Sequence, residues 1–232
     1  MQTYCERCGP GLFDEPINAV SNIVFLIAGW TAWRQGKRLG SLSLGLWSLI
    51  GLSISVGIGS LTWHTFATPW ALYFDVVPIL LFQLCFLWLY LRYVAIVNRA
   101  IVVSLVLAYI FVDLWLRQYR GRLNGVLLYA PAIGFSLSIG VYHCVRSQRE
   151  PYVLLVSAML FCIALICRTI DLIVCRWLPI GTHFLWHLLN GFVIYLSLRA
   201  LIVSFAEYPD PEVGDSNDEF SDKAADRCPA IR

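Results

Sequence analysis

Seven long apolar stretches follow one another along the chain, and the short segments between them hold most of its charged residues. Each stretch has about 20 residues, the length that a helix needs to cross a bilayer core of roughly 30 Å. We therefore predict an all-α fold, a bundle of seven transmembrane helices. The expected spans are residues 17–33, 42–63, 71–90, 101–116, 126–145, 153–174 and 184–203.

The polar ends of the chain divide it into three parts. Residues 1–16 are predicted to form an N-terminal segment, residues 17–205 the membrane domain, and residues 206–232 a tail. The first span begins too far into the chain, after too acidic a segment, to be a cleaved signal peptide, so we expect it in the mature protein. The tail carries eight acidic residues without apolar periodicity, and we expect it to be disordered and solvated.

The composition indicates an integral membrane protein. Hydrophobic residues make up 59% of the chain and charged residues 14%, far from the balance of a water-soluble domain. Eight of the 15 acidic residues and three of the 17 basic ones follow Phe205, which leaves the body with 14 bases and 7 acids. Membrane loops collect Lys and Arg for topological reasons, and the chain lacks the basic and aromatic groove pattern of single-strand binders. We therefore expect no nucleic-acid partner.

The basic residues also predict the orientation of the bundle. With seven spans, five basic residues fall in loops on the side of the N-terminus and eight in loops on the side of the tail. By the positive-inside rule, the N-terminus is exoplasmic and the tail cytoplasmic. The pattern favours no particular membrane and no particular oligomeric state.

Three of the four histidines fall on one side of the predicted membrane. His64 ends the second span, and His183 and His187 open the seventh, one helical turn apart. Histidines at positions i and i+4 project from one helix face and can hold one metal ion. Three protein ligands with a fourth position open to water are typical of catalytic zinc, which lowers the pKa of the water towards about 7. The pattern predicts a zinc hydrolase with an exoplasmic site.

The general base of such a hydrolase must come from outside the histidine pair. Soluble zinc proteases carry a glutamate between their two histidines, whereas here residues 184–186 are Phe, Leu and Trp. Asp75 begins the third span at the same membrane depth, so we expect it to deprotonate the water. Ser60 lies one turn before His64 and could donate a hydrogen bond to a developing oxyanion. Each of these residues alone would more simply be a packing or helix-pairing residue, but their joint placement favours a site.

Other polar residues of the spans have structural interpretations. His143 ends the fifth span beside Arg146, and we assign it to the cytoplasmic interface without a chemical role. Arg168 and Asp171 lie three residues apart on one face of the sixth span. We expect these two to neutralise one another inside the bundle, because an unpaired charge at membrane depth is costly.

Five short segments, in this order across seven spans, carry a resemblance to a known family. They are Tyr-Cys-Glu-Arg at 4–7, Glu-Pro-Ile-Asn-Ala-Val-Ser-Asn at 15–22, Ser-Leu-Thr-Trp-His at 60–64, Asp75, and His-Phe-Leu-Trp-His at 183–187. With them the chain resembles the alkaline ceramidase family, one of a group of seven-helix membrane hydrolases that includes the adiponectin receptors. The resemblance implies a zinc-dependent amidohydrolase that cleaves the amide of ceramide-like N-acyl sphingoid lipids to a sphingoid base and a fatty acid.

The resemblance also implies roles for individual residues. Zinc would be held by His64, His183 and His187, with Ser60 and Asp75 as catalytic partners. Cys5 and Cys175 would form a disulfide between the N-terminal segment and the end of the sixth helix, on the oxidising side.

A calcium site before the first helix is a further implication, with Glu6 and Glu15 as its acidic ligands. Thr3 and Cys8 stand where an aspartate and an asparagine would be expected, which removes two oxygen ligands from an ion that needs six to eight. The alternative is that Glu15 and Asn18 cap the first helix.

Two other classes of function compete with the hydrolase. A seven-helix lipid receptor or sensor would keep zinc for structure and show little turnover, and the open fourth position argues against it. Haem-linked electron transfer is disfavoured because His183 and His187 share one helix face and cannot bind opposite faces of one haem.

Overall fold

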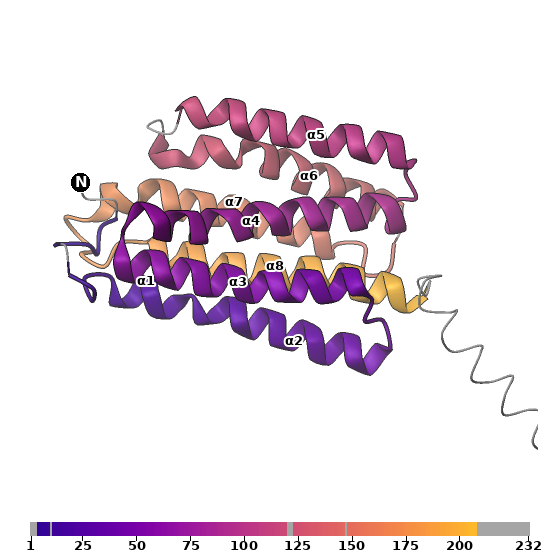
Figure 1. Cartoon of the computed structure of the whole chain (residues 1–232), viewed down its shortest axis with the longest axis horizontal. Helices are drawn as coiled ribbons and strands as arrows, with labels where there is room; N and C mark the ends of the chain where they lie inside the picture. Colours follow the sequence, from indigo (N-terminus) through magenta and orange to yellow (C-terminus); the bar gives the residue numbers. More distant parts are fainter. Residues whose placement is uncertain (1–3, 10, 120–122, 147, 208–232) are drawn as a thin grey trace, which may run out of the picture.

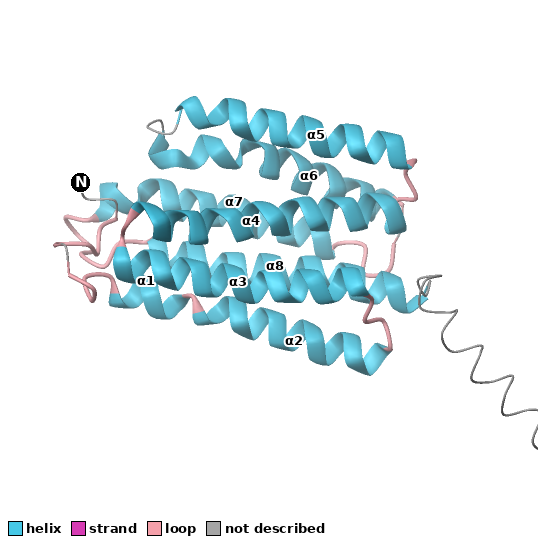
Figure 2. Cartoon of the chain, viewed as in Figure 1, coloured by secondary structure: helices cyan, strands magenta, loops and turns pink. Residues whose placement is uncertain are grey.

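The computed structural model describes residues 4–9, 11–119, 123–146 and 148–207. Of the described residues, 82% are helical and none lies in a strand (Figure 2), which confirms the all-α class. The long helices are α2 (Ile23–Leu39), α3 (Leu44–Phe66), α4 (Pro69–Leu89), α5 (Arg99–Leu116), α6 (Ala130–Val145), α7 (Val153–Val174) and α8 (His183–Glu207). Shorter helical pieces are α1 (Pro16–Ser21), the π-turn η1 (Tyr90–Val94), and the 3₁₀ turns η2 (Arg117–Tyr119) and η3 (Leu123–Tyr129). Of the expected tail, residues 208–232 lie outside the described residues.

Within the described residues, seven helical units are long and apolar enough to cross a membrane, so the chain is a multi-pass membrane protein, as the hydrophobic pattern predicts. The first unit, Pro16–Leu39, consists of α1 and α2 with a break at Asn22. The Asn22 side-chain amide donates to the carbonyl oxygens of Asn18 (2.8 Å) and Ala19 (3.3 Å). A polar side chain that takes these carbonyls competes with the helical ladder and interrupts it.

The helices run side by side, with α8 among α2, α3 and α7 and with α5 at the edge (Figure 1). In the membrane-spanning window of α8, 61% of the residues are buried, against 17% in those of α4 and α5. The core between α2, α3 and α8 is built from apolar residues that are at most 3% exposed, among them Phe25, Leu46, Leu49, Leu198 and Leu201. Because α8 is central, groups on its first turns can meet residues from several other helices.

A short turn joins α3 to α4 and places residues of both helices at the same end of the bundle. Pro69 begins α4, a position where proline is favoured because no helical partner is needed for its nitrogen. His64 lies in the last turn of α3 and Asp75 in the second turn of α4. A Cβ atom on Gly59 would overlap the carbonyl oxygen of Phe74. The backbones of α3 and α4 therefore touch beside His64 and Asp75, and only glycine permits this approach.

A polar network ties the opposite end of the bundle. His143 is fully buried; its Nε2 lies 3.2 Å from the carbonyl oxygen of Arg149, and its Nδ1 lies 2.9 Å from the Tyr90 hydroxyl. A carbonyl only accepts, so Nε2–H donates to it and Nδ1 accepts from Tyr90. Nearby, the Arg199 guanidinium donates to both carboxylate oxygens of Glu150 and holds the pKa of Glu150 below its usual value. His143, expected at the interface, is thus a buried structural residue.

Candidate metal centre

Three histidines from two helices converge at the end of the bundle that carries the N-terminus. His64 comes from the last turn of α3, and His183 and His187 come from the first two turns of α8. One ring nitrogen of each can be chosen so that all three lie within 4.8 Å of one another. The side chains are 1–2% exposed. The structure thus brings together the three histidines that the spacing singles out.

Two of the three imidazoles are oriented through their Nδ1 atoms. The Glu15 carboxylate lies 2.5 Å from Nδ1 of His64, and the Ser21 hydroxyl lies 2.7 Å from Nδ1 of His187. Ser21 donates its one proton to the carbonyl oxygen of Asn18 (2.7 Å), so its oxygen must accept from the His187 Nδ1–H. A carboxylate likewise accepts from the His64 Nδ1–H. In its neutral form each of these two rings therefore carries its lone pair on Nε2.

Glu15 is an ionised acceptor in this arrangement. Burial by itself would raise the pKa of Glu15, but hydrogen bonds from His64, Arg7 and Asn18 outweigh it and hold the pKa below its usual value. An ionised carboxylate that accepts from a metal-binding histidine is the common outer partner of zinc sites.

The nitrogen geometry fits a zinc ion. The Nε2 atoms of His64 and His187 are 3.2 Å apart, and ligand nitrogens about 2.0–2.1 Å from a tetrahedral zinc are separated by roughly 3.3 Å. Two lone pairs that face one another at this distance repel unless a cation lies between them. Among the described residues, none hydrogen-bonds the buried Nδ1 of His183, which leaves this nitrogen available as a third ligand atom.

Ser60 and Asp75 lie beside the histidines. Ser60 is buried on α3, one turn before His64. The Asp75 carboxylate on α4 is half-buried, interacts with the Ser60 hydroxyl, and lies near His64 and the Arg168 guanidinium. The close approach of α3 and α4 at Gly59 makes the Ser60 and Asp75 contact possible. Both residues are therefore placed where a reaction at the histidine cluster would occur.

The N-terminal segment covers the site, which the sequence pattern alone does not predict. The Tyr4 ring stacks on His183 with 3.9 Å between ring centroids, and the Trp63 indole N–H donates to its hydroxyl (3.3 Å). Burial raises the pKa of Tyr4 to about 12 although nearby Arg168 lowers it, so the phenol is neutral. Arg168 also lies over the rings of Tyr129 (5.5 Å) and Trp186 (5.3 Å).

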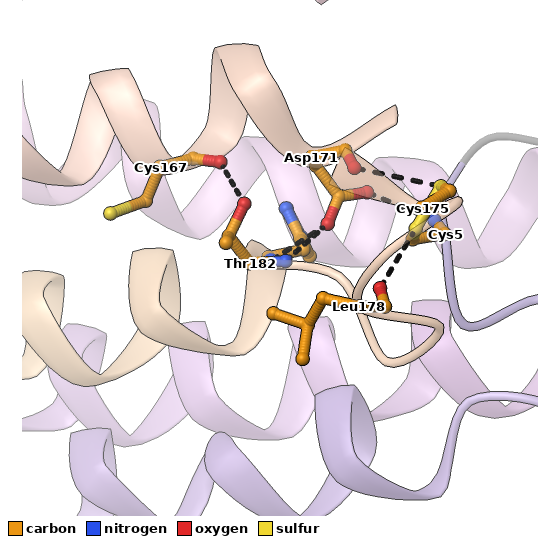
Figure 3. Close-up of a disulfide and its surroundings, with 7 residues drawn as sticks. Cys5, Cys167, Asp171, Cys175, Leu178 and Thr182 are labelled. Atoms are coloured by element: carbon orange, nitrogen blue, oxygen red, sulfur yellow. Dashed lines mark hydrogen bonds between the residues drawn. A yellow bond between two sulfur atoms is a disulfide. The ribbon is translucent and has the colours of Figure 1, made fainter. Parts of the chain in front are cut away.

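Asp171 and a disulfide hold this segment in place (Figure 3). Cys5 and Cys175 are joined by a disulfide, the pair that the resemblance implies. The Asp171 carboxylate accepts from the backbone N–H groups of Cys5 (2.9 Å), Thr182 (2.7 Å) and His183 (2.9 Å). Asp171 thus caps α8 and anchors the N-terminal segment at once.

The partners of Asp171 differ from the expected ion pair with Arg168. Sequence spacing puts both residues on one helix face, but Asp171 bonds backbone groups of two other segments, while Arg168 faces Asp75 and aromatic rings. Gly181 makes this contact possible, since it has a φ of 65° and a Cβ there would overlap the Asp171 carboxylate.

The acidic residues of the expected calcium site are engaged by other groups of the chain. Glu6 accepts from the backbone N–H groups of Ile17 (2.7 Å) and Asn18 (2.9 Å), so Glu6 caps α1. Glu15 occupies the N-cap position of α1 and its backbone carbonyl accepts from Ala19 (2.8 Å), but its side chain makes no cap hydrogen bond. Its carboxylate instead binds Arg7, His64 and Asn18. Thr3 lies outside the described residues. Among the described residues, both carboxylates are therefore engaged by the chain itself, whereas calcium needs six to eight oxygen ligands.

An apolar cavity inside the bundle adjoins the histidines. Aromatic and aliphatic side chains form most of its wall, and Gln83 and Asn190 are its amides. Trp186 lines it and lies between His183 and His187 in the sequence of α8, and Phe25 lines it with its ring centroid 6.4 Å from that of His187. An apolar cavity with few polar groups is typical of a site for a lipid chain.

A protein-family model described as Ceramidase matches residues 12–232 of the chain. The matched range contains the three histidines, Ser60 and Asp75, and it leaves out residues 1–11. Among curated proteins, none matches the chain. The match covers far more than half of the sequence, and it confirms the family that the short segments suggest. The chain therefore belongs to the ceramidase family.

Proposed function

We propose that this ceramidase-type hydrolase is a zinc-dependent amidohydrolase that cleaves ceramide-like N-acyl sphingoid lipids. Family membership supports a hydrolase with a lipid substrate. The main support for zinc-dependent cleavage of an amide is the convergence of three buried histidine nitrogens. They lie next to an apolar cavity and to the pair formed by Ser60 and Asp75. A receptor that kept zinc only for structure would not need Ser60 and Asp75 beside it, so the geometry favours a hydrolase.

In this proposal the chain's own groups prepare and move protons. Glu15 and Ser21 hold the His64 and His187 rings with Nε2 free for the metal. When bound, zinc would supply a Lewis acid and bring the pKa of water at the site towards about 7. Asp75 takes a proton from the attacking water and returns it to the amide nitrogen as the C–N bond breaks. The products are a fatty acid and a free sphingoid amine.

Ser60 and Tyr4 have supporting roles in the proposal. The Ser60 hydroxyl can turn from Asp75 and donate to the oxygen that gains charge on the former carbonyl. The neutral ring of Tyr4 covers His183 and limits access of bulk water from the polar end. The lipid chains would lie in the cavity between the helices, with the amide at the histidines.

The proposed orientation has the N-terminus and the site on the exoplasmic side and the tail in the cytoplasm. The positive-inside pattern supports it, as does the disulfide between Cys5 and Cys175 at that end, since disulfides persist on oxidising sides of membranes.

The test is metal analysis and fatty-acid release by the purified chain in detergent, over several N-acyl lipids. We expect about one zinc per chain, loss of that zinc in His183→Ala, and loss of hydrolysis with a chelator that added zinc restores. His143→Gln removes the histidine at the opposite end and should keep the zinc. Full zinc content in His183→Ala, or hydrolysis that a chelator leaves unchanged, would contradict the proposal.

A further inference from the structure

We propose that the guanidinium of Arg7 takes the place of a calcium ion in the N-terminal segment and is a positioning residue for His64. The inference rests on the proposed function, in which His64 is a zinc ligand. In this proposal the zinc site is held in place by the Arg7 guanidinium, which is always charged, and does not depend on calcium.

Arg7 contacts both the outer partner and the backbone of the same ligand. Its Nε forms an ion pair with one carboxylate oxygen of Glu15, and its Nη2 donates to the backbone carbonyl of His64 (3.0 Å). The other Glu15 oxygen lies 2.5 Å from Nδ1 of His64. Arg7 therefore fixes the position of the histidine's backbone and, through Glu15, the orientation of its ring.

Because Glu15 is buried, its carboxylate needs a cation such as the Arg7 guanidinium beside it. Arg7 is 8% exposed and Glu15 is 2% exposed. An ionised carboxylate at such a position needs a compensating positive charge, because burying it alone costs several kcal/mol. A guanidinium supplies that charge with donors in a planar fork that can serve two acceptors at once. Lysine, a point charge with a different shape, could not make the same pair of contacts.

Among the described residues, the groups near Arg7 offer no set of free oxygens for calcium. Glu6 is used by two backbone N–H groups at the start of α1, and Cys8 offers a sulfur instead of an oxygen. Arg7 also donates to the carbonyl oxygen of Gly9 (3.4 Å), so a backbone oxygen of this segment is engaged as well. Calcium requires six to eight oxygen ligands, whereas the carboxylate oxygens of Glu6 and Glu15 accept hydrogen bonds from groups of the chain itself.

Other tethers hold the segment independently of Arg7. The disulfide from Cys5 and the bond from its N–H to Asp171 fix the chain two residues before Arg7. A change at Arg7 should therefore loosen the His64 ring without releasing the segment, which separates a positioning role from a general loss of structure.

The experiment compares zinc affinity, by competition with a chromogenic chelator, in the wild type, Arg7→Lys, Arg7→Gln and Arg7→Ala. We expect a fall of about 10- to 100-fold in Arg7→Gln, the range for loss of an outer partner, with Arg7→Lys in between. Millimolar guanidinium chloride should restore part of the affinity to Arg7→Ala, and an equal concentration of sodium chloride should not. The matched control is Arg176→Gln, an exposed arginine at the same end, which should keep wild-type affinity.

A second arm uses the wild type alone and so does not depend on how the variants fold. At fixed free zinc, we expect no stoichiometric binding of radioactive calcium by equilibrium dialysis, and less than a twofold change in hydrolysis when calcium is added. Bound calcium, or wild-type zinc affinity in Arg7→Gln, would overturn the inference while leaving the zinc hydrolase intact. A wild type that holds no zinc would instead overturn the proposed function, and the inference with it.

Discussion

Two of the three proposed zinc ligands are oriented by the group on the far side of the imidazole ring. Glu15 and Ser21 both accept from Nδ1–H, so His64 and His187 direct Nε2 lone pairs at one point. Among the described residues, none hydrogen-bonds Nδ1 of His183, so this nitrogen is left for the metal and the site is asymmetric. Control of the tautomer by acceptors outside the metal shell is the usual way in which proteins fix such ligands.

Asp75→Asn should separate metal binding from catalysis. The amide has nearly the shape of the carboxylate and can still contact Ser60, but it cannot take a proton from water, so hydrolysis should fall by about 10²- to 10⁴-fold. Zinc content should stay at the wild-type level because Asp75 is not among the three histidine ligands. Both are measured on the same preparation, by metal analysis and by fatty-acid release. Turnover near the wild-type rate would remove Asp75 from the mechanism.

The grouping of the three histidines was predictable from the sequence, whereas most of their partners were not. His64, His183 and His187 could be grouped because span ends on one side of a membrane must lie at the same depth, and because a spacing of four fixes a helix face. Ser21 lies 166 residues from His187, and Tyr4 meets His183 only because the N-terminal segment folds over the bundle. Contacts of this kind depend on how segments far apart in the sequence pack together, which apolar periodicity does not encode.

At the scale of elements, the approach of α3 to α4 decides where the proposed base sits. Gly59→Ala would place a methyl group against the Phe74 carbonyl and push α4 outward, together with Asp75. Such overpacking costs about 1–3 kcal/mol, and we expect a lower melting temperature in detergent with a larger loss of kcat than of zinc affinity.

Gly51→Ala is the matched control for that change. Gly51 lies on the same helix, and no neighbouring atom lies within 4 Å of the position that a Cβ would take there. Alanine at this position should therefore be neutral or stabilising by up to about 1 kcal/mol through helix propensity. Equal effects of the two substitutions on melting temperature and kcat would show that the contact with α4 does not matter.

The hydrophobic pattern predicted the seven spans but not how they begin or end. Apolar length reports the membrane core, and helices continue into charged residues such as Lys37 and Arg38 at the end of α2. The break at Asn22 and the cap of α8 by Asp171 depend on individual hydrogen bonds. Asp171 looked like the partner of Arg168 because spacing on one helix cannot reveal a backbone donor 166 residues away.

At the scale of the whole molecule, the proposed zinc would join α3 to the central helix α8, and its removal should lower the stability of the bundle. A ligand that binds only the folded state stabilises it by RT ln(1 + [L]/Kd), about 4 kcal/mol at a thousandfold excess over Kd. Chelation should therefore lower the melting temperature of the wild type in detergent, and added zinc should restore it. His187→Ala, which removes a ligand from α8 but leaves the Cys5–Cys175 disulfide, should melt at one temperature with or without zinc. If that variant keeps the zinc-dependent shift, the metal binds elsewhere and the three histidines are not its ligands.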